Sequence, residues 1–234
     1  MELTVGTWRF AIEQIRPSLP ELAETYDQAA TGWQESIHRL GYPQAYAELF
    51  KRVGELSFLD HLQAGGAVLD AGIGTGALSA ALLQKKNIPL LLSGIDISTV
   101  MLEETRARLN PLTQNLFLSQ QDVQNTTFPS NHFDLVMAAH TLEHLNDPIG
   151  GLRELVRVLK PGQPLLLVIS RRHFLSAWLQ IKWAISRTTP ADLQACFAEA
   201  GLEDIQMLPL RSRPWVSHMS IACVGVKADL NSRD

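Results

Sequence analysis

The chain has 234 residues, of which 46% are hydrophobic and 19% are charged, and its formal net charge is -4. These values are typical of one globular domain with appended elements and a substantial core. A slightly acidic balance gives no sign of the basic surface by which most proteins bind nucleic acid. The longest apolar runs, such as Leu165–Ile169, have the length of a strand, so no membrane-spanning helix is expected.

Cysteine usage and the N-terminus bear on the compartment. The sequence holds two cysteines, Cys196 and Cys223, and neither belongs to a cluster with metal-ligand spacing. Sparse cysteine is typical of a reducing environment. The first residues, which include Glu13, do not have the pattern of a signal peptide. We therefore expect a cytoplasmic protein.

Residues 1–64 are largely helical by pattern. Apolar residues recur at helical spacing over 19–36 and 44–62, and three prolines interrupt the pattern. We expect this segment to form an N-terminal helical cap, followed by a second unit over residues 65–234.

The segment Val68–Ser79 is the most informative part of the chain. A short apolar strand leads into Asp70, then into glycines at every second position, then into a helix. Glycine permits unusual backbone angles and close approach, and such a turn brings backbone N–H groups and a carboxylate to one point. A small polar cofactor is therefore expected at the carboxyl end of this strand.

Two kinds of cofactor fit the glycine turn. Gly72, Gly74 and Ala77 satisfy the G-x-G-x-x-A dinucleotide pattern, and Asp96 follows about 20 residues later, where a ribose-binding acid is expected. Asp70 points elsewhere, because its charge opposes a pyrophosphate and suits a cation. The third glycine, Gly76, also comes one position before the place that the dinucleotide pattern requires.

Strand and helix patterns alternate between residues 65 and 170. Strands are expected near 67–70, 91–96, 115–119, 133–138 and 164–170, and helices near 76–86, 98–109 and 149–158. Such alternation predicts a parallel sheet covered on both faces, which binds ligands at the carboxyl ends of its strands.

The remaining residues contain an aromatic segment, followed by one expected helix and two expected strands. Residues 171–188 form an aromatic amphipathic stretch, which we expect to cover the substrate. Thr189 and Pro190 have the pattern of a helix start, with the helix ending at Gly201. Two strands are expected near 203–210 and 218–227.

Further motifs follow the glycine turn in a fixed order. They are Leu91–Ile97, Asp122-Val123, Phe133–Ala138, His140–Leu145 and Leu155–Ile169. With the D-x-G-x-G-x-G turn, this order resembles the class I S-adenosylmethionine (SAM)-dependent methyltransferases over roughly residues 65–170. The resemblance implies an α/β, Rossmann-like, doubly wound mixed sheet of seven strands, with helices on both faces, an N-terminal helical cap and a C-terminal antiparallel hairpin.

The resemblance also implies which residues hold the cofactor. In that family the glycine turn wraps the methionine end of SAM, and acids at later strand ends hold the nucleoside. Here Asp96 would accept from both ribose hydroxyls, while Asp122 and the Val123 N–H would meet the adenine. The full expected set is Asp70, Gly72, Gly74, Gly76, Asp96, Ile97, Met101, Asp122, Val123 and Ala138. Asp134 begins a strand at its other end, so we assign it a structural role.

A cluster of His140, Glu143 and His144 follows the fourth expected strand and should face the reaction centre. If a helix turn starts there, all three side chains share one face. Either histidine is a candidate general base. With His173 the cluster has the donors of a divalent metal site, but His140 stands where related metal-binding enzymes have Glu. We expect no metal and name His140 and His144 as catalytic candidates.

Four other residues are candidates for contact with the substrate. Tyr26 and Trp33 lie on a predicted helix that, by the resemblance, covers the SAM pocket. His173 and Trp178 follow the fifth strand and belong to the expected covering segment. Aromatic residues at helical spacing also serve as plain packing, and both interpretations stay open.

The sequence thus predicts a SAM-dependent methyltransferase. It would transfer a methyl group to an O, N or C atom of a small-molecule acceptor and release S-adenosylhomocysteine, with no nucleic acid partner. Two alternatives remain, namely an NAD-dependent oxidoreductase that uses the same glycine turn and a non-catalytic SAM-binding protein. Methylation of a protein or nucleic acid is a lesser alternative, since no Asn/Asp-Pro-Pro-Tyr signature is present.

Overall fold

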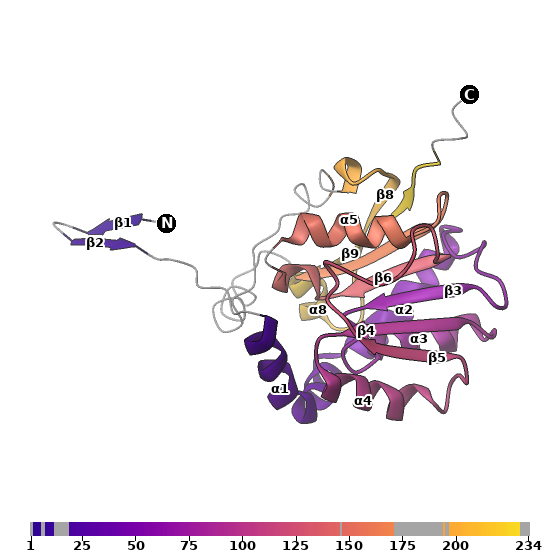
Figure 1. Cartoon of the computed structure of the whole chain (residues 1–234), viewed down its shortest axis with the longest axis horizontal. Coiled ribbons are helices and arrows are strands. Elements are labelled where there is room, and N and C mark those ends of the chain that lie inside the picture. The colour runs from indigo at the N-terminus through magenta and orange to yellow at the C-terminus, as the bar shows by residue number, and fades with distance from the viewer. Residues whose placement is uncertain are drawn as a thin grey trace.

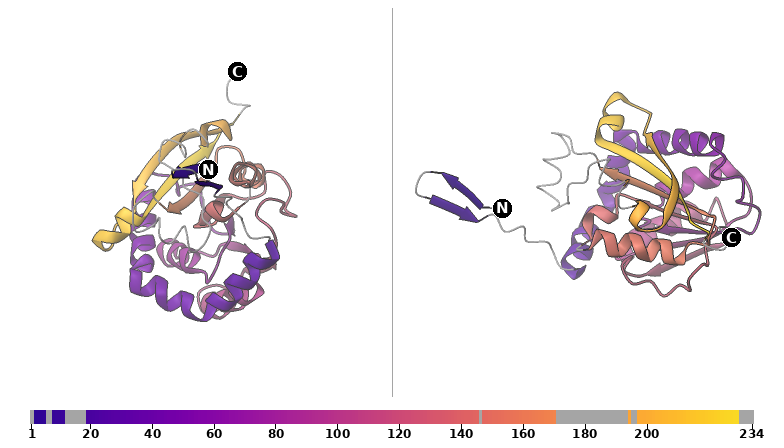
Figure 2. Two further views of the ribbon diagram at one scale, coloured as in Figure 1. Left: turned by 90° about the vertical axis from the view of Figure 1, so that its left-hand side faces the viewer. Right: turned by 90° about the horizontal axis from the view of Figure 1, so that it is seen from above.

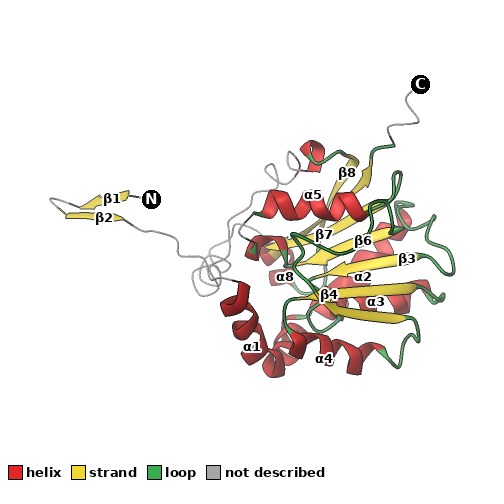
Figure 3. Ribbon diagram, viewed as in Figure 1, coloured by secondary structure: helices red, strands yellow, loops and turns green. Residues whose placement is uncertain are grey.

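The centre of the molecule is a seven-stranded sheet with the order β5-β4-β3-β6-β7-β9-β8. The computed structural model describes residues 2–5, 8–11, 19–145, 147–170, 194 and 197–229. Strands β3 to β7 pair in parallel, and β9 pairs antiparallel with both β7 and β8 (Figures 1 and 3). The strands are β3 (Ala67–Ala71), β4 (Leu91–Asp96), β5 (Leu116–Gln120), β6 (Leu135–Ala139), β7 (Pro164–Ser170), β8 (Leu202–Pro209) and β9 (Ser220–Lys227). The expected doubly wound mixed sheet is confirmed.

Helices cover both faces of this sheet (Figure 2). Along β7, Leu166 and Val168 belong to one hydrophobic core, while Leu165 and Leu167 belong to the other. Every second side chain of a strand faces the same way, so this strand is apolar on both faces. The first core takes residues from α2 (Tyr42–Glu55), α3 (Ala77–Lys86) and α4 (Thr99–Leu109), and the second from α5 (Pro148–Val158).

Two helices precede the sheet, as the apolar pattern predicts. They are α1 (Leu19–Leu40) and α2, and Gly41 joins them with a φ of 87° that favours glycine. Helix α1 packs on α4 and α2. Two short strands, β1 (Glu2–Val5) and β2 (Trp8–Ala11), pair antiparallel near the N-terminus, a hairpin that the sequence pattern did not predict.

The C-terminal strands differ from the expected simple hairpin in one detail. A short helix, α8 (Pro214–Met219), lies between β8 and β9, with a proline in its first turn. The substrate-covering segment expected over 171–188 and the helix start at Thr189 and Pro190 lie outside the described residues. In the described part of the chain, no helix combines the length and apolarity that crossing a membrane requires.

Asp134 ties together the end of the sheet that lies away from the strands' carboxyl ends. Its Oδ2 accepts a hydrogen bond of 2.9 Å from the backbone N–H of Ala67, where β3 begins. Its Oδ1 accepts from Lys160 Nζ at 2.7 Å. The acid therefore joins the start of β3 to the residues before β6 and β7, which matches the structural role expected from the sequence.

We expect Asp134→Ala to lower the free energy of unfolding by about 1–2 kcal/mol. Most of the loss comes from the unpaired Ala67 N–H, because the Lys160 side chain is 41% exposed and water screens its charge. Urea unfolding of both proteins measures the difference, with Glu103→Ala on the exposed face of α4 as the control. An unchanged midpoint would contradict the structural role.

Candidate functional site

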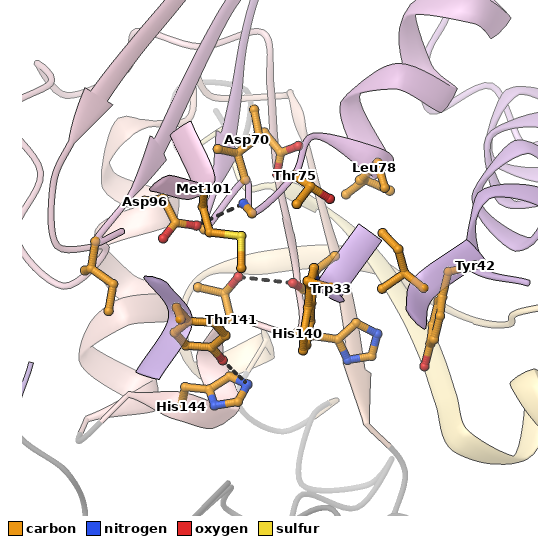
Figure 4. Close-up of a pocket in the computed structure, with 18 of the residues that line it drawn as sticks. Trp33, Tyr42, Asp70, Thr75, Leu78, Asp96, Met101, His140, Thr141 and His144 are labelled. Carbon is orange, nitrogen blue, oxygen red and sulfur yellow. Dashed lines mark hydrogen bonds between the residues drawn. The ribbon is translucent and has the colours of Figure 1, made fainter. Parts of the chain in front are cut away.

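A cavity of about 610 Å³ lies at the carboxyl ends of β3, β4 and β6. This is where the strand order reverses about β3, the usual ligand site of such sheets. Most of the residues predicted from the sequence line it (Figure 4). They are Tyr26, Trp33, Asp70, Gly72, Gly74, Asp96, Ile97, Met101, Asp122, Val123, His140 and His144.

Two predicted cofactor residues are not among those that line the cavity. Gly76 caps α3 with a φ of 73°, and a Cβ there would lie 3.1 Å from the Leu109 side chain, so its role is packing α3 against α4. Ala138 is buried in the second core, and the cavity is lined by Ala139 instead. Successive strand residues face opposite sides, so the prediction missed by one position. His173 and Trp178 lie outside the described residues.

The glycine turn requires glycine at Gly72 for two reasons. Its φ is 70°, and a Cβ at this position would lie 2.3 Å from Thr141 Oγ1. Thr141 Oγ1 in turn donates to the carbonyl oxygen of Ala71 at 3.0 Å. The turn after β3 therefore packs directly against the turn after β6.

The backbone N–H groups of the turn are mostly used within the protein. The N–H groups of Gly72 and Ile73 both donate to the carbonyl oxygen of Ile95, at 2.8 and 2.9 Å. The Gly74 N–H donates to Asp96 Oδ2 at 2.9 Å. The expectation that these groups converge on a ligand is therefore wrong, because they fasten the turn to β4.

Thr75 is a site residue that the sequence pattern did not single out. Its side chain is buried, it lines the cavity, and its Oγ1 has no hydrogen-bond partner in the described part of the chain. Buried hydroxyls are usually paired, so an unpaired one in a cavity wall indicates a place for a polar ligand group. Its position between two glycines of the motif was the available signal.

Asp70 is buried at the end of β3, and its Oδ2 accepts from Ser79 Oγ at 2.6 Å. Burial raises the pKa of this carboxyl to about 7, against the lowering effect of the Ser79 hydrogen bond, and the nearby Asp96 raises it further. A cation bound beside Asp70 would relieve this cost.

Asp96 is also buried, at the end of β4. Burial raises its pKa, while the backbone N–H groups of Ser98 and Gly74 lower it. The Ser98 bond is 3.0 Å and the Gly74 bond is 2.9 Å, and because one goes to each carboxylate oxygen they hold the group in one orientation. Each carboxylate oxygen can accept a further bond, which leaves room for two hydroxyls of a ligand.

The predicted adenine side of the cavity combines apolar and polar contacts. Ile97 and Met101 line it from the start of α4. Asp122 Oδ1 accepts from the Gln124 N–H at 2.9 Å and so stabilises its own turn, while both Asp122 and Val123 face the cavity. Asp122 therefore stabilises its own turn and also faces the part of the cavity expected to hold the adenine.

The His140, Glu143 and His144 cluster does not form one helical face. His140 has a φ of 55°, and only Leu142–His144 form a short 3-10 helix. His140 stacks edge-to-face with Tyr42 at 5.3 Å between ring centroids, whereas His144 Nε2 bonds to the Tyr26 hydroxyl at 3.0 Å. Figure 4 shows the two rings on different sides of Thr141.

Glu143 lies between the two histidines and is 3% exposed. Its Oε1 is 3.2 Å from His140 Nδ1 and accepts from the Ser170 N–H at 3.2 Å. Burial opposes its ionisation, but the His140 hydrogen bond and the two nearby imidazoles hold the pKa of this carboxyl below its usual value. Burial lowers the pKa of His144, so that ring is neutral at physiological pH.

The predicted substrate-side aromatics meet this cluster from α1. Burial, and then the charges of Asp96 and Glu143, raise the pKa of Tyr26, so its phenol stays protonated and bonded to His144. Trp33 packs edge-to-face on Tyr26 and lines the cavity. Among the residues that the structure describes, no group of three or more His, Cys, Asp or Glu is placed to hold a metal ion.

We expect Asp70→Asn to stabilise the protein increasingly as the pH rises. The folded pKa is about 7 against an ordinary value of 3.8, so the wild type loses stability between about pH 4 and pH 7 and bears the full cost above pH 7. The gain reaches at most about 4 kcal/mol and vanishes near pH 4. Denaturant titrations across this range test it, and a difference independent of pH would contradict it.

Part of this chain matches a known protein family. Residues 69–167 match a family model described as "Methyltransferase domain". The matched segment runs from β3 to β7 and so includes the glycine turn, both buried acids and the His140 cluster.

Curated relatives match over a similar length. Ubiquinone/menaquinone biosynthesis C-methyltransferase UbiE of Neisseria meningitidis is 36% identical over 108 residues, which are 46% of this chain and 44% of the relative. The protein of the same description from Shewanella frigidimarina is 34% identical over 106 residues, 44% of this chain and 42% of the relative. The match thus spans less than half of each relative.

Solved structures share the fold over most of the chain. The complex between the Haloferax volcanii Trm112 methyltransferase activator and the putative methyltransferase contains a chain with a TM-score of 0.71 and 19% identity, over 87% of this chain and 98% of that one. The [4+2]-cyclase SpnF has a TM-score of 0.67 and 19% identity over 92% and 97%. A possible histamine N-methyltransferase from Thermotoga maritima has 0.64 and 19% over 87% and 99%.

Proposed function

We propose that this chain, whose residues 69–167 match the methyltransferase domain family, transfers the methyl group of SAM to a small-molecule acceptor. One observation carries the proposal. Two buried carboxylates, Asp70 and Asp96, stand at the ends of neighbouring strands with the Gly72–Gly76 turn between them, and both face one cavity.

The residues of this cavity fit SAM from one end to the other. Asp70 suits the cationic methionine end, and the unpaired Thr75 hydroxyl offers it a hydrogen bond. Asp96 is oriented to accept from the ribose hydroxyls, and Ile97 and Met101 offer apolar contact to the adenine. When bound, SAM supplies a methyl group that its sulfonium already activates, so the protein contributes position and a dry cavity.

The same contacts argue against the dinucleotide alternative. A pyrophosphate needs free backbone N–H groups at a glycine turn. Here the N–H groups of Gly72 and Ile73 already donate to Ile95, and that of Gly74 donates to Asp96. Asp70 would also place a buried carboxylate against a dianion.

The acceptor would occupy the side of the cavity next to α1 and α2. Trp33, Ile37, Tyr42, Tyr46 and Met219 line this side. A mainly aromatic and apolar wall with few polar groups is the usual lining of a small-molecule site. We assign Tyr26 and Trp33 to contact with SAM or the acceptor on this basis, and His173 and Trp178 stay predictions.

A second candidate function and the cellular setting each follow from one observation. A solved structure described as a [4+2]-cyclase shares this fold, so a chemistry other than methyl transfer is the second candidate. A reducing, cytoplasmic setting is supported by Cys223, a free and buried thiol.

We expect calorimetry to detect binding of SAM and S-adenosylhomocysteine and none of NAD. Asp96→Ala should weaken SAM binding at least about tenfold, because charge-assisted bonds to the ribose are lost. Asp134→Ala, at the opposite end of the sheet, serves as the matched control and should bind SAM as the wild type does. Binding of NAD in place of SAM would overturn the proposal.

We also expect SAM binding near pH 7 to release protons. The pKa of Asp70 is about 7 in the free protein, so the carboxyl is partly protonated, and a nearby cation lowers the pKa. Calorimetry in buffers of different ionisation enthalpy measures the release. In Asp70→Asn the release should disappear, and its persistence there would exclude Asp70 as the partner of the cation.

A further inference from the structure

We infer that His140 is the general base of this methyl transfer, that Glu143 positions it, and that the acceptor is a hydroxyl compound which is neutral when it binds. The inference deepens the proposed function and rests on it. It distinguishes His140 from His144, which the sequence could not separate.

Glu143 determines which ring nitrogen of His140 carries the proton. Glu143 Oε1 lies 3.2 Å from His140 Nδ1, and the side chain of Glu143 is 1% exposed. An ionised carboxylate only accepts hydrogen bonds, so Nδ1 must carry the proton and donate it to Glu143. In a neutral ring this leaves a lone pair on Nε2, which is the arrangement that a base requires.

The other ring nitrogen of His140, Nε2, is available to a ligand in the cavity. The atom is buried and has no hydrogen-bond partner in the described structure, although the His140 ring lines the cavity. An unpaired buried nitrogen is costly, and a ligand hydroxyl would satisfy it. The Tyr42 ring, edge-to-face at 5.3 Å, and Ser170 Oγ, 3.2 Å from Nδ1, hold the imidazole in place.

The backbone conformation of His140 also indicates a functional role for its side chain. His140 is in the left-handed region with a φ of 55°, which costs a residue with a side chain about 1 kcal/mol or more. The His140 N–H donates to the Val168 carbonyl oxygen at 2.8 Å, which holds this conformation against β7. Glycine would fit the backbone better, so histidine at this position indicates a use for the imidazole.

His144 has a different environment. Its Nε2 is bonded to the Tyr26 hydroxyl at 3.0 Å, and the two rings stack edge-to-face at 5.6 Å between centroids, so the nitrogen without a partner in the described structure is Nδ1. The bond joins the 3-10 helix η1 (Leu142–His144) to α1, so His144 helps to position the helix that covers the cavity. The groups around His140 are Glu143 and His144 from η1, Tyr42 from α2 and Ser170 from β7.

The methyl transfer requires only these residues, the acceptor and the bound cofactor. The acceptor hydroxyl gives its proton to His140 Nε2 while its oxygen forms a bond to the methyl carbon. The bond from that carbon to sulfur breaks, and its electron pair returns to the sulfur. Glu143 stabilises the imidazolium that forms, through the Nδ1–H bond. A thiolate acceptor has already lost its proton and would not need this base. Loss of His140 should therefore affect a hydroxyl acceptor and spare a thiolate.

The tautomer can be measured without any acceptor. Nitrogen-15 NMR of the histidine side chains should show His140 protonated at Nδ1 and bare at Nε2 when the ring is neutral. In Glu143→Gln the preference should weaken, because a neutral amide can accept or donate. A wild-type ring protonated at Nε2 would overturn the inference.

Kinetics with a matched pair of probes test the base itself. We name 4-methylphenol and 4-methylbenzenethiol, the second of which is largely ionised at mildly alkaline pH. His140→Gln should lower kcat for the phenol about 100-fold and leave both SAM affinity and kcat for the thiol within about threefold. Glu143→Gln should lower kcat for the phenol with little change in KM, which separates positioning from binding.

Two variants keep the test decisive. His140→Gly removes the imidazole and relieves the positive φ, so it provides a folded protein if the glutamine variant is unstable. His132→Gln, an exposed histidine before β6, is the control for substitution of a histidine. Equal losses with phenol and thiol, a larger loss in His144→Gln, or a wild type that binds SAM and methylates only the thiol would each overturn the inference. Absence of SAM binding would instead overturn the proposed function.

Discussion

The close approach of Gly72 to Thr141 is the contact on which the site depends. It brings the turn after β3 against the turn after β6, since a Cβ at Gly72 would lie 2.3 Å from Thr141 Oγ1. The two neighbours of this contact are the parts with chemistry, Asp70 on one side and His140 on the other. A larger residue at Gly72 would move the acid and the histidine apart, so a single glycine controls the distance between the cofactor end and the acceptor end of one cavity.

The elements of the sheet were predictable because each depends on local pattern. Strands β3 to β7 lie within about two residues of their expected ranges, and for central strands such as β6 and β7 the reason is that a buried parallel strand is a continuous apolar run. The acids at strand ends follow from the same reasoning. Ala138 was wrong by one position, because the side-chain phase of a strand depends on where pairing begins, and both faces of β6 are buried.

Contacts between distant segments were not predictable. Tyr26 and His144 are 118 residues apart, and no pattern indicates that their rings meet. The internal use of the turn's N–H groups also depends on Ile95, a residue of another strand. Likewise the sequence indicated a helical face at His140, whereas packing against β7 holds that residue in a left-handed conformation. Non-local packing decided that Nε2 is the unpaired nitrogen in His140, whereas in His144 the Nε2 is bonded to Tyr26 and the unpaired nitrogen is Nδ1.

The free protein keeps several unfavourable features within this one cavity. Asp70 and Asp96 are buried near each other, the hydroxyl of Thr75 is unpaired, and His140 is strained with an unpaired Nε2. Each costs stability, and the two cores on either side of the sheet supply the stability that tolerates them. A bound cation beside Asp70 and a hydroxyl beside His140 would satisfy opposite ends of the cavity at once. Binding of both ligands would therefore stabilise the folded protein, because each satisfies a buried group that is costly on its own.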